Sequence, residues 1–150
     1  MQYDENLIDN IIMTMTSINK KLRLIVEKDL QPFGITGPQF HMLLALKREG
    51  GTRVTHLADL MKVKPSAITV IMDRLIEREL VQRTHSLEDR RVVMMELSPK
   101  GIELLEEVRQ SHQKMMSHYF SRFSEEELST FLQLFEKLDG VISTTNREGS

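Results

Sequence analysis

The sequence predicts a mainly α-helical fold that contains one small β-hairpin. Apolar residues recur every three or four positions through six segments, as they do along one face of a helix. Two short segments rich in β-branched and apolar residues, 80–84 and 92–97, flank a charged stretch and predict the hairpin. The chain has 150 residues, of which 40% are hydrophobic, 7 are glycine and 4 are proline. This composition is typical of one folded domain and unlike that of a disordered chain.

The first half of the chain predicts three helices. An apolar stripe over 7–30 indicates a long amphipathic helix, which the Pro-Phe-Gly sequence at 32–34 ends. Thr36, followed three residues later by Gln39, forms a capping box that opens a second helix, and a glycine pair closes it. A third helix of about two turns covers 55–61.

The second half predicts three more helices around the hairpin. The helix over 65–79 starts with a proline, which is favourable at a first helical position. Ser98 and Pro99 cap and start a helix whose apolar side extends to Phe123. A second capping box at 124–127 begins the last helix.

The long terminal helices predict a homodimer. A helix of about 24 residues is about 36 Å long, so the outer part of its apolar stripe needs another surface to cover it, and a second copy of the chain is the economical partner. We expect an interface above about 2,000 Å². We expect a single domain over 1–150, with a lobe at 35–100 and dimerisation helices at 1–34 and 101–150.

Charge and motif content exclude several classes of protein. The net charge is −2, but residues 53–91 carry 8 Lys and Arg against 6 Asp and Glu, which makes the middle of the chain its basic part. The absence of cysteine excludes thiol chemistry and thiolate metal sites. The longest apolar run, 42–46, is too short for a membrane span, and the acidic start is unlike a signal peptide, so we expect a cytoplasmic protein. The chain lacks the common catalytic motifs, so we expect no enzyme.

The order helix, helix, strand, strand over 55–97 predicts a winged helix-turn-helix, whose second helix enters the major groove of DNA. Five motifs stand at the corresponding positions: LADLMKV at 57–63, AIT at 67–69, DRL at 73–75, DRR at 89–91 and LSPKG at 97–101. On these motifs the sequence resembles the MarR (multiple antibiotic resistance regulator) family over nearly its whole length. The resemblance implies a homodimeric transcriptional regulator, usually a repressor. Such a regulator binds a near-palindromic operator in double-stranded DNA and often releases it when a small molecule binds.

Base contacts are expected from the first turns of the 65–79 helix, because its N-terminal residues reach the groove edges. Ser66 and Thr69 are the main candidates. Lys64 is a poor helix cap, so we interpret it as a phosphate or guanine contact, and Val70 can contact a thymine methyl. Many family members have Ser at the position of Lys64 and Arg at that of Val70, so the family's operator sequences cannot be carried over. Lys62 and Arg83 are weaker candidates for phosphate contacts, with ordinary surface charge as the alternative.

The wing tip has a different expected role. Asp89 and Arg91 are two residues apart, so their side chains can share a face of a tight loop. The resemblance implies that Arg91 enters the minor groove, beside Arg90, and that Asp89 forms an ion pair that braces the wing. Arg74 or Arg78 is the expected partner of Asp89.

The resemblance also implies an effector pocket where the dimer helices meet the DNA-binding lobe. Its walls would include Met15, Ile18, Phe40, His41 and Met116. These side chains suit an aromatic or fatty molecule with an acidic or phenolic head, with ordinary core packing as the alternative.

Two alternatives stay open. A metal-responsive regulator would use His41, His112 or His118, but the last two are six residues apart and do not share a helix face, so we expect no metal site and no cofactor. A winged-helix adaptor that binds proteins without DNA would lack the steep salt dependence of phosphate contacts.

Overall fold

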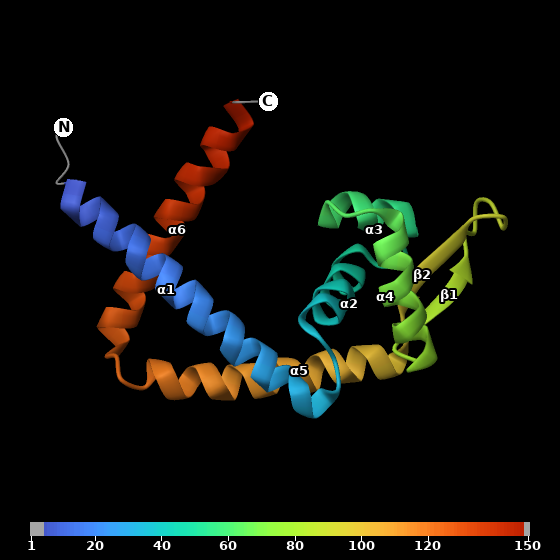
Figure 1. The fold of residues 1–150 in the computed structure, drawn as a ribbon, viewed down its shortest axis with the longest axis horizontal. Helices are drawn as coiled ribbons and strands as arrows, with labels where there is room; N and C mark the ends of the chain where they lie inside the picture. Colours follow the sequence, from blue (N-terminus) through green and yellow to red (C-terminus); the bar gives the residue numbers. More distant parts are fainter. Residues whose placement is uncertain (1–4, 149–150) are drawn as a thin grey trace. The chain divides into compact units, whose positions relative to one another are not determined.

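A computed structural model describes residues 5–148 of the chain and confirms the mainly α-helical fold with one hairpin (Figure 1). The elements in chain order are α1 (Glu5–Leu30), the 3₁₀ helix η1 (Gln31–Phe33), α2 (Gly37–Glu49), α3 (Val54–Met61), α4 (Pro65–Glu77), β1 (Val81–His85), β2 (Val93–Leu97), α5 (Pro99–Phe120) and α6 (Glu125–Glu148). The backbone divides within α5 into two compact units, residues 1–112 and 113–150. In the described part of the chain, no helix combines the length and the apolarity needed to span a membrane.

Both predicted capping boxes are present. The Thr36 hydroxyl accepts from the backbone N–H of Gln39 (3.3 Å), and the Gln39 side chain accepts from the N–H of Thr36 (3.0 Å). At the start of α6, Ser124 and Glu127 make the same reciprocal pair, at 3.1 and 2.8 Å. These bonds satisfy N–H groups that have no partner within the helix and fix where α2 and α6 begin.

The end of α4 differs from its prediction. The helix ends at Glu77, two residues earlier than its apolar pattern predicts, because Glu79 has a left-handed φ of 61°. The N–H of Leu80 donates to the carbonyl of Leu75 (2.9 Å), which closes the helix end. Leu80 and Val81 then carry the chain into β1 with both side chains buried.

The first unit contains one hydrophobic core beneath α2, α3, α4 and the hairpin. Side chains with at most 1% exposure come from three of these helices and include Leu43, Leu57, Ile68 and Leu75. Leu105 and Val108 add the first half of α5 to the same core. Burial of leucine- and isoleucine-sized side chains stabilises a fold by about 1.5–3 kcal/mol each, so this core is a main source of the lobe's stability.

The strands β1 and β2 are antiparallel, with Val81 opposite Leu97 and His85 opposite Val93. A third segment joins them, because Thr52 pairs with Met95 through two backbone hydrogen bonds of 2.9 and 2.7 Å. This pairing was not expected from the sequence. It attaches the loop before α3 to the base of the hairpin.

The predicted LSPKG motif has a packing role. The N–H of Ser98 donates to the carbonyl of Leu80 (3.1 Å), and the Ser98 hydroxyl accepts from the N–H of Gly101 (3.0 Å). A side chain at Gly101 would overlap the Leu80 carbonyl oxygen. Only glycine therefore lets α5 start this close to Leu80, the residue before β1.

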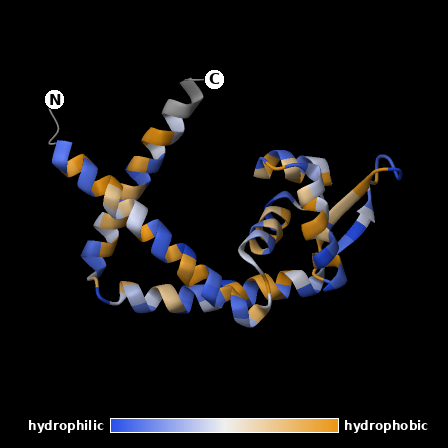
Figure 2. Ribbon diagram, viewed as in Figure 1, coloured by the Kyte–Doolittle hydropathy of each residue, from blue (hydrophilic) through white to orange (hydrophobic). Residues whose placement is uncertain are grey.

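In contrast, α1 and α6 carry apolar stripes that the chain leaves exposed, visible as runs of hydrophobic colour in Figure 2. On α1 the exposed apolar residues include Leu7, Ile8, Ile11, Ile12 and Ile18. On α6 a continuous stripe, which we call the α6 stripe, comprises Phe131, Leu134, Phe135, Leu138, Val141 and Ile142, each 39–61% exposed.

Candidate nucleic-acid interface

The predicted helix-turn-helix consists of α3 and α4. Lys62 lies in the turn with a left-handed φ of 52°, and its N–H donates to the Asp59 carbonyl at 3.2 Å. The N–H of Val63 donates to the Ala58 carbonyl at 3.1 Å. These two bonds end α3 sharply, so that α4 can start after only three intervening residues.

The two faces of α4 differ in burial. Ile68 and Met72 point into the core, whereas Ser66 and Thr69 are exposed and Val70 is 55% exposed. The Thr69 hydroxyl donates to the Pro65 carbonyl (3.0 Å), and its oxygen keeps lone pairs that can accept. The residues predicted to contact bases therefore share the solvent face at the start of α4.

The N-terminus of α4 also suits an anion. Lys64 occupies the N-cap position with an extended backbone, and Pro65 follows it. In the described part of the chain no side chain caps this end. The first-turn N–H groups and the helix dipole therefore favour a phosphate there, and the N-cap residue Lys64 adds a positive charge to the same end of the helix.

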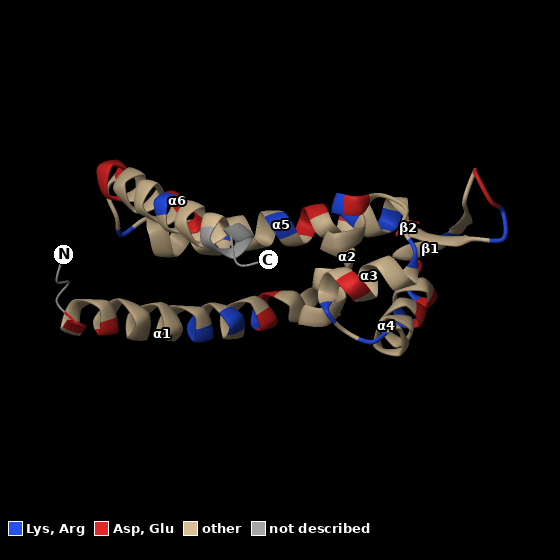
Figure 3. Ribbon diagram, turned by 90° about the horizontal axis from the view of Figure 1, so that it is seen from above, with Lys and Arg blue, Asp and Glu red and all other residues tan. Residues whose placement is uncertain are grey.

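The wing is the β1–β2 hairpin, and its loop is ordered by its own polar groups. The N–H of Ser86 donates to the carbonyl of Val92 (3.0 Å), and the N–H of Val92 donates to the carbonyl of Asp89 (2.9 Å). The Ser86 hydroxyl accepts from the N–H groups of Glu88 (3.2 Å) and Asp89 (3.5 Å). Figure 3 shows the acidic and basic residues of this loop together at its tip.

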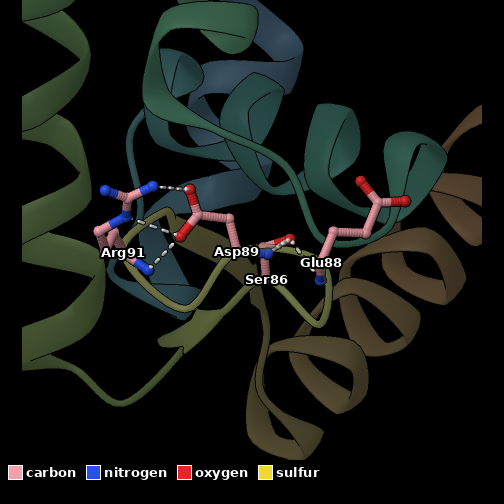
Figure 4. A network of polar contacts seen from close by, with 4 residues as sticks. All are labelled: Ser86, Glu88, Asp89 and Arg91. Atoms are coloured by element: carbon pink, nitrogen blue, oxygen red, sulfur yellow. Dashed lines mark hydrogen bonds and ion pairs between the residues drawn. The ribbon is translucent and has the colours of Figure 1, made fainter.

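Asp89 and Arg91 form the predicted shared face of the loop (Figure 4). The Asp89 carboxylate accepts three bonds from Arg91: from the backbone N–H (3.0 Å), from Nε (3.1 Å) and from Nη2 (3.2 Å). The side-chain bond from Arg91, followed by its backbone bond, lowers the pKa of Asp89 below its ordinary value. The bonds to Asp89 hold the Arg91 guanidinium in place. The Arg91 side chain is nevertheless 92% exposed, so other groups can still reach it.

Arg78 has a different partner from the one expected. The sequence predicts that Asp89 pairs with Arg74 or Arg78, but the bonds of Asp89 come from Arg91. The Arg78 guanidinium instead donates to the backbone carbonyls of Phe33 and Gly34. The physical reason is its position at the C-terminus of α4, facing the end of η1, while Arg74 is exposed on the helix.

The other predicted cations lie on the surface of the same unit. Arg83, on β1, donates to Asp73 of α4 (3.0 Å), and both side chains are more than half exposed. A surface pair of this kind contributes little to stability, so Arg83 can exchange Asp73 for a phosphate at small cost. Lys62 and Arg90 are exposed.

Sequence reasoning missed Arg53. It directly follows Thr52, whose pairing with Met95 brings the start of α3 to the hairpin. Its charge is close enough to Asp89 to add to the lowering of the pKa of that carboxyl group, after the side-chain and backbone hydrogen bonds from Arg91. A single-residue bridge leaves no periodic signal in the sequence, so only its basic charge at the edge of the 53–91 segment could have drawn attention to it.

The residues expected around an effector are divided between the two units. In the first unit Met15 and Phe40 are half-buried, whereas Ile18 and His41 are exposed, and Phe40 packs against the core. Met116 is half-buried and belongs to the second unit. The pocket stays a prediction. Among residues 5–148, no three or more His, Cys, Asp or Glu side chains form a group that could hold a metal ion.

Comparison with known proteins gives consistent results. The model of the MarR family matches residues 35–93, which include α2, α3, α4 and β1. A curated relative, the HTH-type transcriptional repressor MdtR of Bacillus subtilis (strain 168), is 30% identical over 148 residues, covering 99% of this chain and 96% of the relative.

Solved structures agree in fold. The structure of a MarR family protein from Bacillus stearothermophilus is similar with a TM-score of 0.85 and 28% identity, over 95% of this chain and 99% of that one. The crystal structure of the YusO protein from Bacillus subtilis is similar with a TM-score of 0.77 and 31% identity, over 93% and 99% of the two chains. The arrangement of α3, α4 and the wing is therefore one that known regulators share.

Proposed function

Since the chain belongs to the MarR family of DNA-binding transcriptional regulators, which are not enzymes, we propose that it is a homodimeric repressor. It binds a near-palindromic operator in double-stranded DNA, and a small apolar effector releases it. Residues 35–100 bind the DNA, and residues 1–34 and 101–150 hold the dimer together. The similarity to MdtR, which is named a transcriptional repressor, supports repression rather than activation.

The observation that carries the proposal is the exposed polar start of α4 combined with the exposed Arg91 of the wing. A major groove admits a helix whose first turn carries hydrogen-bonding groups, and Ser66 and Thr69 supply them. Arg91 supplies an exposed guanidinium at the wing tip, and arginine side chains are commonly inserted into the minor groove. Contacts from α4 to the bases would determine which sequence is bound. Contacts from the basic residues to the DNA phosphates would supply most of the affinity.

The exposed apolar stripes support the homodimer. A single chain leaves Ile11 and Ile12 of α1 and the α6 stripe in contact with water, and exposed apolar patches of this extent are typical of interfaces. A two-fold dimer would present two copies of α4, and a two-fold protein binds DNA half-sites that are inverted repeats of each other.

The effector part of the proposal rests on the chemistry of the predicted walls. Methionine and phenylalanine give an adaptable apolar lining, and His41 gives one polar group. An effector of this kind must bind the DNA-incompetent form more tightly than the DNA-bound form. A tenfold loss of operator affinity corresponds to about 1.4 kcal/mol of differential binding.

The test begins with selection of bound sequences from a random duplex library, followed by binding to the selected duplex at several salt concentrations. We expect an inverted repeat and an affinity that falls steeply with salt, because neutralised phosphates release counterions. A protein-binding adaptor would instead select no sequence and show a shallow salt dependence, which would contradict the proposal.

Effector release is tested on the selected duplex with aromatic and fatty weak acids and, separately, with zinc. We expect the acids to release the duplex and zinc to leave it bound. Stoichiometric zinc uptake that changes duplex affinity, and that is abolished by His41→Ala or His112→Ala, would favour the metal-responsive regulator instead.

A further inference from the structure

The three residues that link α4 to β1, Arg78, Glu79 and Leu80, connect α4 to both helices that leave the lobe. Arg78 makes the first connection. Its guanidinium donates through Nη1 to the Gly34 carbonyl (2.5 Å) and through Nη2 to the Phe33 carbonyl (2.9 Å). Both carbonyls lie at the end of η1, which directly continues α1. The C-terminus of α4 is thereby joined to the end of α1.

Glu79 and Leu80 make the second connection, to the start of α5. The Ser98 hydroxyl donates to the Glu79 carbonyl (2.5 Å), and the Ser98 N–H donates to the Leu80 carbonyl (3.1 Å). Lys100, in the first turn of α5, pairs with the Glu79 carboxylate (3.3 Å). All of these groups lie within the first compact unit, so the contacts that join α4 to α1 and to the start of α5 are contacts within one unit.

The chemistry of the Arg78 contact is specific to arginine. Gly34 has a left-handed φ of 65°, which ends η1 and leaves its last carbonyls to partners outside the helix. A planar guanidinium places two N–H donors side by side, so one side chain can bind two consecutive carbonyls. Lysine carries a single ammonium group and cannot reproduce this fork.

We propose that Arg78 is a positioning residue that fixes the direction of α4 relative to α1 and thereby the separation of the two α4 helices in the dimer. The consequence for DNA spacing rests on the proposed function. Ser66 lies twelve residues before Arg78, which is about 18 Å along the helix. A rotation of about 5° at Arg78 would move the start of α4 by about 1.6 Å over that length. The distance between the two α4 starts in the dimer would then change by about 3 Å. This is close to the rise of about 3.4 Å per base pair.

The first experiment measures this separation without DNA. The chain has no cysteine, so Ser66→Cys gives one attachment point for a spin label in each protomer, and pulsed electron resonance reports the distance between the two labels. We expect a narrow distribution with Arg78 present. In Arg78→Ala the distribution should shift or broaden by about 3 Å. Arg78→Lys should lie between the two, since it can bind one carbonyl.

Arg48→Ala is the matched control. Arg48 is also a partnered arginine at the end of a helix, but its guanidinium pairs with the adjacent Glu49. We expect its distance distribution to equal that of the parent protein. Each variant is first checked for a cooperative thermal transition, and Arg78→Lys carries the test if Arg78→Ala does not fold.

The second experiment uses the selected inverted repeat with its spacer lengthened or shortened by one base pair. We expect the parent protein to prefer one spacer by about tenfold and Arg78→Ala to retain less than about threefold preference. Unchanged distances, or an unchanged spacer preference in a folded Arg78 variant, would overturn the proposal. Changed distances in a protein that selects no DNA sequence would support the positioning role and contradict the proposed function.

Discussion

The lobe and α6 use the same kind of hydrophobic periodicity for different purposes. In the lobe the periodic residues are buried, and Leu57, Ile68 and Leu75 have no exposed surface. In α6 the periodic residues remain in water, with Leu134 61% exposed and Val141 56% exposed. An apolar stripe therefore does not by itself say whether its partner is the same chain or another one.

The difference shows where each part of the molecule obtains its stability. The lobe buries residues of α2, α3, α4 and the hairpin in one core within a single chain. The helix α6 is fixed at its start by the Ser124 and Glu127 capping box, but its stripe gains the burial energy only when another surface covers it. Changes in the two regions should therefore have different consequences, which the following predictions use.

The largest effect is expected in the lobe core. Ile68→Ala removes a fully buried side chain and leaves a cavity, so the free energy of unfolding should fall by about 2–5 kcal/mol in urea denaturation. Val70→Ala, on the exposed face of the same helix, should change it by less than about 0.5 kcal/mol. Equal losses in the two variants would show that α4 is not packed as described.

The next effect concerns the α6 stripe. Leu134→Glu places a charge in the proposed dimer interface, and we expect the dimer dissociation constant to rise at least about 100-fold, or about 2.8 kcal/mol, in sedimentation equilibrium. Gln133→Glu adds the same charge on the opposite face of the helix and should leave the dimer intact. A parent protein that is monomeric at micromolar concentration would contradict the homodimer.

Arg91→Ala should separate DNA binding from assembly. We expect weaker binding to the selected duplex by about 1–3 kcal/mol and a salt slope smaller by about one phosphate equivalent, with an unchanged dimer mass. Leu134→Glu, by contrast, should reduce both the dimer and the duplex affinity. An Arg91 variant with the parent's salt slope would show that the Arg91 side chain does not contact phosphate.

Ser66→Ala and Thr69→Val should change which sequence is bound more than how tightly DNA is bound. Both hydroxyls lie on the exposed start of α4, and lost base contacts reduce discrimination by about 1–3 kcal/mol at the affected position only. Thr69→Ser keeps the hydroxyl and is the matched control. If selection from a randomised library returns the parent sequence for both variants, another face of α4 contacts the bases.

The sequence predicted the elements because their signals are local. The capping residues Thr36 and Ser124 and the proline at position 65 mark helix starts, and the structure confirms all three. The early end of α4 was missed because it depends on the left-handed backbone of Glu79, a residue type that rarely adopts this conformation.

The site was predicted less completely because its connections are not local. Asp89 and Arg91 are two residues apart, and their shared face could be predicted from spacing. The contact of Arg78 with Gly34 joins residues 44 apart, and the bridge that brings Arg53 toward the wing depends on how α3 packs. Such contacts follow from the tertiary fold and have no periodic signal in the chain.

The smallest expected effect is the most selective test of the wing. Asp89→Ala removes a negative charge close to the proposed DNA surface, so electrostatics alone predicts tighter binding. The three bonds from Arg91 predict the opposite, because without the carboxylate the guanidinium loses its fixed position. We expect binding to weaken by about threefold to tenfold in fluorescence anisotropy.

Glu88→Ala is the matched control, since Glu88 adds the same charge to the same loop and only its backbone N–H bonds to Ser86. We expect its binding to be unchanged or slightly tighter. The pKa of Asp89 is lowered from 3.8 by its bonds with Arg91, so its ion pair is present above that pH and is lost only as the pH falls through the lowered pKa. The ratio of parent to Asp89→Ala affinity should therefore stay constant from about pH 5 to pH 8. If both variants tighten binding equally, Asp89 acts only through its negative charge and does not hold Arg91 in place for DNA.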